Sequence, residues 1–311
     1  MTYGIPGGDG LSRNERREAA REKAKTLRDE QRKKDKRNRI FIQGGVVIAF
    51  LAIAGALAFT FMSVANRPET VGPRNMLSDG ILIGEGFVAK PTAALQPGNE
   101  PTANVRDEAS DVISIQLFVD YFCPVCGTFE KTNGDQIATL VESGAATVEI
   151  FPYAILDSVS QGTKYSTRAA NAAACVADYS PDQYFDFNRI MFANQPKEGT
   201  GGLTDEQIVD LASDAGVENG SAIAKCVTDQ KFKDWVAAAR DRHRLKGVPN
   251  SNVSTVEGTP TVIVNGTKYT GALNDAAAFN AFVLQAANAT YNDNTESTST
   301  PTPTPTGTPK P

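Results

Sequence analysis

The chain has 311 residues, of which 41% are hydrophobic and 22% are charged, and this composition excludes a wholly disordered protein. The formal net charge is −5, but residues 1–39 carry thirteen Lys or Arg against seven Asp or Glu, so the rest of the chain carries −11. An acidic body argues against nucleic-acid binding. Four cysteines and a single histidine, His243, exclude a Cys2His2 zinc finger and argue against a histidine-dependent catalytic triad.

The first 64 residues predict a membrane anchor. Residues 1–39 are basic and lack an apolar stripe, and we interpret them as a cytoplasmic topology signal; binding to anionic lipid headgroups is the alternative. Ile40–Val64 contains no charge and spans about 37 Å as a helix, more than the roughly 30 Å of a hydrocarbon core. We therefore expect one transmembrane helix, with the N-terminus in the cytoplasm and the rest outside. A signal peptide cleaved near Ser63-Val64-Ala65 is the other interpretation.

Two segments have the composition of linkers. Residues 65–110 contain five prolines and scattered glycines, which indicates an extracytoplasmic tether in which Ile81–Ile83 and Phe87-Val88 could form a short hairpin. Residues 289–311 are rich in Asn, Thr, Ser and Pro, and we expect an extended, disordered tail. The folded domain should therefore occupy about residues 111–288.

The first half of that domain predicts an α/β fold. Val112–Val119 has the pattern of a buried central strand, Phe129–Val141 of a helix and Ala146–Phe151 of a second strand, which together make a βαβ unit. Residues 163–246 are helical in pattern throughout and form an inserted helical subdomain. Within the insertion we expect His243 at the surface and four aromatic residues in the core: Phe185, Phe187, Phe192 and Trp235.

The last part of the domain returns to strand and helix. Pro260–Val264 is apolar and β-branched, and Asn265-Gly266 predicts a tight hairpin to Thr267–Thr270. A helix from Asp275 to Ala287 should end the fold.

Cys123-Pro124-Val125-Cys126 stands where the buried strand ends and the first helix begins. Cys123 would cap that helix, where free backbone N–H groups and the positive helix end stabilise a thiolate. A stabilised thiolate is the attacking species in disulfide exchange, and Cys126, one turn on, could resolve a mixed disulfide at Cys123. The alternative is half of a zinc site, but its other ligands would have to come from Cys175, Cys226 and His243, which are widely separated in sequence.

A second motif that bears on the chemistry is Gly258-Thr259-Pro260-Thr261-Val262. Its proline stands at the start of a strand, where it cannot donate a ladder hydrogen bond. A cis bond between Thr259 and Pro260 would leave the Thr259 backbone free to pair with an extended substrate chain. An ordinary proline at a strand edge is the alternative.

Together, FVDYFCPVC at residues 118–126, the helical insertion and GTPTVIVNG at residues 258–266 resemble the DsbA-like thioredoxin-fold family. The resemblance covers about residues 111–288 and is strongest to the exported, membrane-anchored members from Gram-positive and actinobacterial envelopes. It implies a thioredoxin fold with an inserted helical subdomain. It also implies Cys123 as the nucleophile, Cys126 as the resolving cysteine, and Thr259-Pro260 as the cis-proline loop opposite them.

The sequence departs from that family in three places. Val125 replaces a frequent histidine between the cysteines and supplies no hydrogen bond to the thiolate, so the disulfide should be less oxidising. Leu117 stands where some relatives have an acidic residue, which leaves Asp120 as a polar neighbour that either transfers protons or orients a turn. Val248 to Glu257 makes a longer approach to the cis-proline loop, which we expect to be a surface loop.

Cys175 and Cys226 lie in separate expected helices of the insertion. The resemblance implies a second, structural disulfide between them, which would close a loop of about fifty residues and stabilise the fold by about 4 kcal/mol. A redox-relay role is the alternative, but neither cysteine stands in a Cys-x-x-Cys motif.

These features predict a membrane-tethered thiol:disulfide oxidoreductase that introduces disulfides into exported cysteine-containing proteins. The resemblance implies reoxidation by a quinone-linked membrane oxidase of the DsbB or VKOR-like kind. We expect no organic cofactor, because the dithiol itself carries two electrons, and we expect no metal and a monomer. The alternatives are an extracytoplasmic reductase and a non-catalytic chaperone that holds extended chains in the cis-proline groove.

Overall fold

The computed structural model describes residues 70–105 and 110–298. The basic segment at residues 1–39 and the expected anchor at Ile40–Val64 lie outside the described residues. Within those two described ranges, no helix combines the length and the apolar character needed to cross a membrane.

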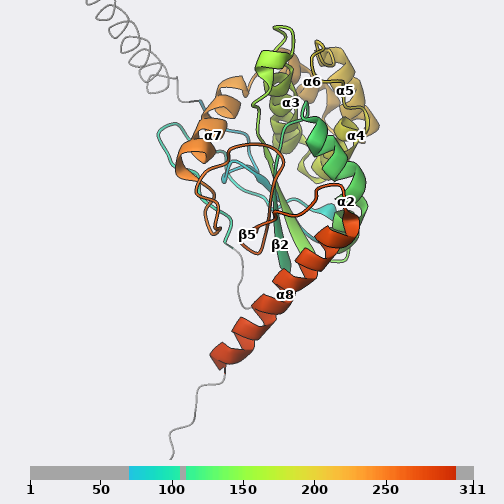
Figure 1. Cartoon of the computed structure of the whole chain (residues 1–311). Coiled ribbons are helices and arrows are strands. Elements are labelled where there is room, and N and C mark those ends of the chain that lie inside the picture. The colour runs from blue at the N-terminus through green and yellow to red at the C-terminus, as the bar shows by residue number, and fades with distance from the viewer. Residues whose placement is uncertain (1–69, 106–109, 299–311) are drawn as a thin grey trace, which may run out of the picture. The chain divides into compact units, whose positions relative to one another are not determined.

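A five-stranded sheet forms the centre of the domain (Figure 1). Its strand order is β1-β3-β2-β4-β5, and β2 pairs in parallel with β3 while the other neighbours are antiparallel. The helix α2 (Pro124–Glu142) connects β2 to β3, so the expected βαβ unit is confirmed. The expected hairpin at Asn265-Gly266 is also confirmed, and both residues have the positive φ that this turn requires. The strands are β1 (Ile81–Ile83), β2 (Ile113–Val119), β3 (Ala146–Pro152), β4 (Thr261–Val264) and β5 (Thr267–Lys268).

The expected helical insertion lies between β3 and β4. It consists of α3 (Tyr165–Tyr179), α4 (Tyr184–Ala193), α5 (Asp205–Asp214), α6 (Gly220–Thr228) and α7 (Lys233–Lys246). Short 3-10 turns cover Glu85–Phe87, Asp157–Val159 and Pro181–Gln183, and the helix α8 (Ala276–Thr298) follows β5.

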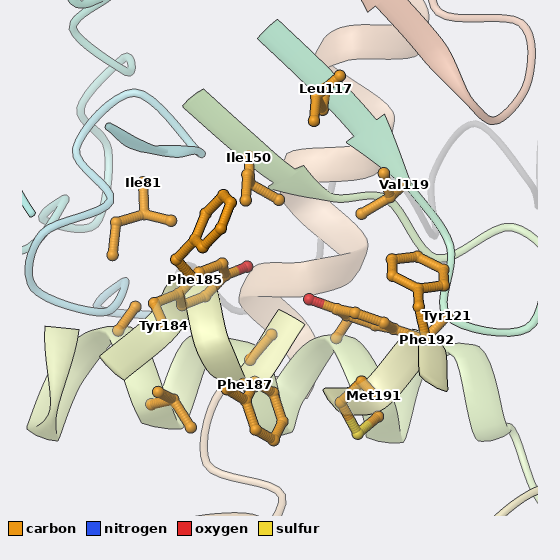
Figure 2. Close-up of a cluster of buried hydrophobic side chains, with 14 of the residues drawn as sticks. Ile81, Leu117, Val119, Tyr121, Ile150, Tyr184, Phe185, Phe187, Met191 and Phe192 are labelled. Carbon is orange, nitrogen blue, oxygen red and sulfur yellow. The ribbon is translucent and has the colours of Figure 1, made fainter. Parts of the chain in front are cut away.

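The main core lies on one face of the sheet, against α4 of the insertion (Figure 2). Alternate residues of β2 and β3, such as Leu117 and Ile150, point to this face because successive side chains of a strand face opposite sides. Aromatic residues of α4 meet them, and the four aromatic residues expected in the core are buried: Phe185, Phe187, Phe192 and Trp235.

A smaller core lies on the opposite face and corrects two expectations. His243 was expected at the surface, but it is only 6% exposed and its ring meets Phe118 and Phe151 edge-on, with centroids 4.9 and 5.2 Å away. Val248 to Glu257 was expected to be a surface loop, but Val248, Val253 and Val256 are buried in the same cluster. The three valines cover apolar side chains on the sheet face opposite to α2. Burial of this apolar surface holds the segment from Val248 to Glu257 against the sheet.

The expectation of a tether at residues 65–110 is wrong for its described part, whereas the short hairpin expected within it is present as an antiparallel bridge between Ile83 and Ala89. β1 pairs antiparallel with the outer edge of β3, and Ile81 and Ile83 are fully buried. Arg74 pairs with Asp178 at the end of α3, at 2.9 Å. The three consecutive apolar residues of β1 cover the open edge of β3 and bury their own side chains. This pairing and burial decide the structure of the segment, in spite of the linker-like prolines around it.

The expected C-terminal end of the last helix is also wrong. α8 begins near Asp275, whose carboxylate accepts the backbone N–H groups of Ala277 and Ala278 at 3.0 Å, but it continues to Thr298 instead of ending at Ala287. The first ten residues of the expected disordered tail, 289–298, are therefore helical. The reason is local, because the alanine-rich sequence contains no Gly or Pro between residues 276 and 300. Residues 299–311 lie outside the described ranges.

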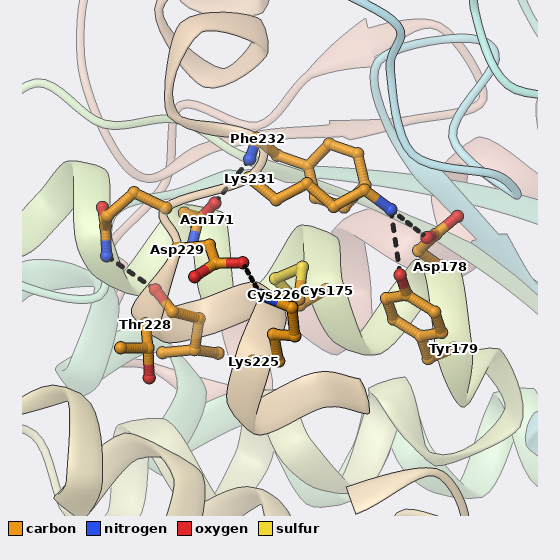
Figure 3. The surroundings of a disulfide bond; sticks show 12 residues. Asn171, Cys175, Asp178, Tyr179, Lys225, Cys226, Thr228, Asp229, Lys231 and Phe232 are labelled. Carbon is orange, nitrogen blue, oxygen red and sulfur yellow. Dashed lines mark hydrogen bonds and ion pairs between the residues drawn. A yellow bond between two sulfur atoms is a disulfide. The ribbon is translucent and has the colours of Figure 1, made fainter. Parts of the chain in front are cut away.

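Cys175 of α3 and Cys226 of α6 form a disulfide, as Figure 3 shows. Both residues are buried. Polar contacts surround the bond: Asn171 accepts the backbone N–H of Phe232 at 2.7 Å, and Lys231 reaches Asp178 at 3.0 Å. The disulfide therefore joins α3 to α6, and these hydrogen bonds connect α3 to the segment that follows α6.

Candidate active site

The two remaining cysteines, Cys123 and Cys126, are free thiols at the start of α2. β2 ends at Val119, and Cys123 is the N-cap residue of α2 with Pro124 at the first helical position, as expected from the sequence. The carbonyl of Cys123 accepts the N–H of Gly127 at 3.2 Å, which closes the first turn of the helix. This turn places both thiols at the positive end of the helix.

The two thiols have opposite pKa shifts. A hydrogen bond with the Cys126 thiol is the largest influence on Cys123 and lowers its pKa to about 6, against a smaller opposing effect of burial. The Thr259 side chain and the backbone N–H groups of Cys126 and Val125 lower it further. Burial raises the pKa of Cys126 well above its ordinary value. At neutral pH the site therefore combines one thiolate with one protonated thiol.

Alkylation of the reduced protein should report this thiolate directly. We expect the rate at Cys123 to be half-maximal near pH 6, because only the thiolate reacts with iodoacetamide. In a Cys126→Ala protein the midpoint should move upward, because the largest stabilising hydrogen bond is removed. Mass spectrometry of samples quenched across the pH range measures both midpoints, and an unchanged midpoint in the variant would contradict this origin of the shift.

The Thr259–Pro260 peptide bond is cis and lies against Cys123. The Cys123 thiol donates to the Thr259 carbonyl at 3.3 Å. The β2–β4 ladder ends at the pair Phe118–Thr261, so Thr259 and Pro260 stand outside it. The two sequence signals, 136 residues apart, thus meet at one place.

Asp120 is buried under the turn that leads to Cys123. Its carboxylate accepts the backbone N–H of Phe122 at 2.9 Å, and those of Ile155 and Leu156 at 2.8 and 3.1 Å. Burial raises the pKa of this carboxyl in spite of these bonds. Both oxygens are occupied by backbone donors from two segments, and this geometry supports the turn-orienting role over proton transfer.

The cysteines and the histidine that a zinc site would need are engaged elsewhere. Cys175 and Cys226 are bonded to each other, and the ring of His243 packs edge-on against the stacked rings of Phe118 and Phe151. Across residues 70–105 and 110–298, no group of three or more His, Cys, Asp or Glu side chains is arranged to hold a metal ion.

A family model described as thioredoxin matches residues 106–283, more than half of the chain. The chain belongs to this family. The match spans β2 to α8 and includes the CxxC motif, the helical insertion and the cis-proline loop. With the adjacent thiols at the helix start, it confirms the expected DsbA-like thioredoxin fold with an inserted helical subdomain, and the protein is a thiol:disulfide oxidoreductase.

Solved structures and curated proteins from Mycobacterium tuberculosis are similar to this oxidoreductase. The reduced disulfide bond oxidoreductase DsbG is 28% identical, with a TM-score of 0.50, over 70% of this chain and 94% of that one. Reduced DsbA is 28% identical, with a TM-score of 0.49, over 70% of this chain and 99% of that one. The serine/threonine-protein kinase PknE is 33% identical over 109 residues, which is 34% of this chain but only 19% of the kinase. The resemblance to the kinase is thus confined to a small part of it.

Gln195 is a residue of the site that the sequence analysis missed. It lies between α4 and α5 in the insertion, and its side-chain amide donates to the carbonyl oxygens of Tyr121 and Cys123 at 3.1 and 2.9 Å. No motif marks it, because 72 residues separate it from Cys123 and its environment arises only when the insertion packs against α2.

The surface beside the thiols is apolar. Val125 is 48% exposed, next to an exposed Pro124, whereas Cys126 is buried behind them. The exposed side chains of this Pro–Val pair present apolar area to solvent but no hydrogen-bonding group to the thiolate. The Val125 side chain therefore adds nothing to thiolate stability, which the Cys126 thiol, Thr259 and the backbone N–H groups of Val125 and Cys126 provide.

Proposed function

We propose that this oxidoreductase is a membrane-tethered oxidase that introduces disulfides into exported proteins, with Cys123 as nucleophile and Cys126 as resolving cysteine. The observation that carries the proposal is the lowered pKa of Cys123 beside the raised pKa of Cys126. A stabilised Cys123 thiolate favours the reduced form of the pair, and a pair whose reduced form is stabilised is a strong disulfide donor.

The exchange proceeds in two balanced steps. A substrate thiolate attacks the Cys123 sulfur of the Cys123–Cys126 disulfide, the S–S bond breaks, and Cys126 leaves and takes up a proton. A second substrate thiolate then attacks the substrate sulfur of the mixed disulfide, and Cys123 leaves as a thiolate. Two substrate thiols are oxidised and one enzyme disulfide is reduced. Thr259 and Pro260, which stand outside the ladder beside Cys123, would hold the substrate backbone during both steps.

The N-terminal sequence supports a site of action outside the cytoplasm. Ile40–Val64 would anchor the chain, with residues 1–39 in the cytoplasm and the catalytic domain outside. The Cys175–Cys226 disulfide supports this placement, because structural disulfides persist in oxidising compartments. The enzyme would act as a monomer on exported cysteine-containing proteins and would be reoxidised by a quinone-linked membrane oxidase of the DsbB or VKOR-like kind, without an organic cofactor of its own.

The reduction potential of the Cys123–Cys126 pair tests the direction of the reaction. Equilibration of the protein with glutathione buffers, followed by mass spectrometry, should give a value of roughly −120 to −180 mV, in the range of disulfide donors. A value near that of thioredoxin, about −270 mV, would instead assign a reductase. Val125, whose side chain gives the thiolate no hydrogen bond, is the feature that favours this second candidate.

A further inference from the structure

The active-site turn is held by a side chain from the helical insertion. The amide nitrogen of Gln195 donates to two carbonyl groups, Tyr121 at 3.1 Å and Cys123 at 2.9 Å, which stand on either side of Phe122. Both carbonyls belong to the short connection between β2 and α2. One amide therefore bridges the two ends of the turn that carries the nucleophile.

The backbone of Gln195 is itself fixed. Its N–H donates to the carbonyl of Phe192 at 3.2 Å, at the end of α4, and the ring of Phe192 packs on Tyr121 with centroids 5.1 Å apart. Pro196 follows at once and restricts the conformation of Gln195 to the extended region. The amide is thus presented by a rigid support, as a positioning group requires.

The surface of α2 leaves room for this amide only because residue 127 is glycine. A Cβ at Gly127 would lie 2.2 Å from the Oε1 atom of Gln195, far inside any permitted contact. The N–H of Gly127 also donates to the Cys123 carbonyl that Gln195 holds. The first turn of α2 and the insertion therefore meet at one carbonyl group.

From these contacts we propose that Gln195 is a positioning residue of disulfide exchange, through which the helical insertion holds the Cys123 turn in its reactive geometry. The carbonyl that Gln195 binds belongs to the same turn as the N–H groups of Val125 and Cys126, which are directed at the Cys123 sulfur and stabilise its thiolate. Release of this carbonyl lets the turn rotate and weakens those bonds. The inference rests on the oxidoreductase activity and is independent of the direction proposed above.

The test is a Gln195→Ala variant, compared with the unchanged protein in two measurements. Loss of the amide should move the glutathione equilibrium of the Cys123–Cys126 pair about two- to tenfold toward the disulfide, the range expected for one hydrogen bond. The pH midpoint for alkylation of Cys123 should rise in parallel. Gln195→Glu should shift both further in the same direction, because an ionised carboxylate cannot donate to the carbonyls and places negative charge near the thiolate.

Gln161→Ala is the matched control. The side-chain amide of Gln161 donates to the carbonyl of Gly199 at 2.8 Å, in the same connection between α4 and α5, but it does not reach the Cys123 turn. This variant should leave the equilibrium and the midpoint unchanged. If Gln195→Ala lowers the stability of the fold but moves neither quantity, Gln195 is only structural and the proposal is wrong.

A Gly127→Ala variant provides an independent route if Gln195→Ala does not fold. It keeps the glutamine but forces its amide away from the turn, and the equilibrium and the midpoint should shift as in Gln195→Ala. No shift in a folded Gly127→Ala protein would also overturn the proposal. If the unchanged protein does not exchange with glutathione at all, the oxidoreductase function itself is wrong. This result differs from an exchanging protein that the Gln195 and Gly127 variants leave unaltered, which would contradict only the role of Gln195.

Discussion

Replacement of Cys123 by Ser is expected to abolish dithiol exchange, whereas replacement of Cys126 by Ser is expected to leave a protein that captures its substrates as stable mixed disulfides. The reason is that Cys123, with its pKa lowered to about 6, supplies the attacking thiolate, and Cys126 supplies the sulfur that releases the partner. Reduction of a model protein disulfide by each prereduced variant, followed by non-reducing electrophoresis, measures both outcomes.

The two single variants also separate an enzyme from a binding module. A chaperone that only holds extended chains in the cis-proline groove would keep its cellular role after Cys123→Ser, whereas an oxidoreductase would lose it. Mixed disulfides that form through Cys126 in the Cys123→Ser protein would reverse the assigned roles. A protein without Cys175 and Cys226 is the appropriate control, since it lacks the other two sulfurs and keeps the active pair.

Removal of the second disulfide, by Cys175→Ser with Cys226→Ser, is expected to lower the free energy of unfolding by about 4 kcal/mol, from the chain entropy of a loop with a sequence separation of 51. The bond joins α3 to α6, away from the start of α2, so dithiol exchange by the folded variant should persist. Denaturant unfolding monitored by circular dichroism gives the first quantity, and reduction of a model disulfide gives the second.

Two different outcomes would contradict this prediction. An unchanged free energy of unfolding would mean that the surrounding contacts, such as the Asn171–Phe232 hydrogen bond, hold the helices without the disulfide. Loss of exchange in a variant that remains folded would instead favour the redox-relay role for Cys175 and Cys226.

The parts of the fold that sequence could predict are those with local signals. The placement of Cys123 at a helix start follows from a buried strand, a cysteine and a proline in succession, and the hairpin follows from Asn265-Gly266. The meeting of Cys123 with Thr259 needed the family resemblance, because 136 residues separate them.

The expectations that failed depend on what each segment packs against. Nothing near His243 in the sequence shows that its ring will pack against Phe118 and Phe151, and the flanking arginines point to the opposite conclusion. Ile81–Ile83 was expected only as part of a short hairpin, because three residues do not show that the segment will also pair with the edge of β3. Gln195 was missed for the same reason, since its two carbonyl partners are supplied by a distant part of the chain.

The burial of the second disulfide keeps the two sulfur pairs chemically independent. Cys175 is 0% and Cys226 3% exposed, and thiol–disulfide exchange requires a thiolate to approach a sulfur along the axis of the bond it breaks. The Cys123 thiolate of one molecule therefore has no path to the Cys175–Cys226 bond of another. An enzyme that meets other copies of itself is in this way protected from scrambling its own cross-link, and each catalytic cycle begins from the same covalent structure.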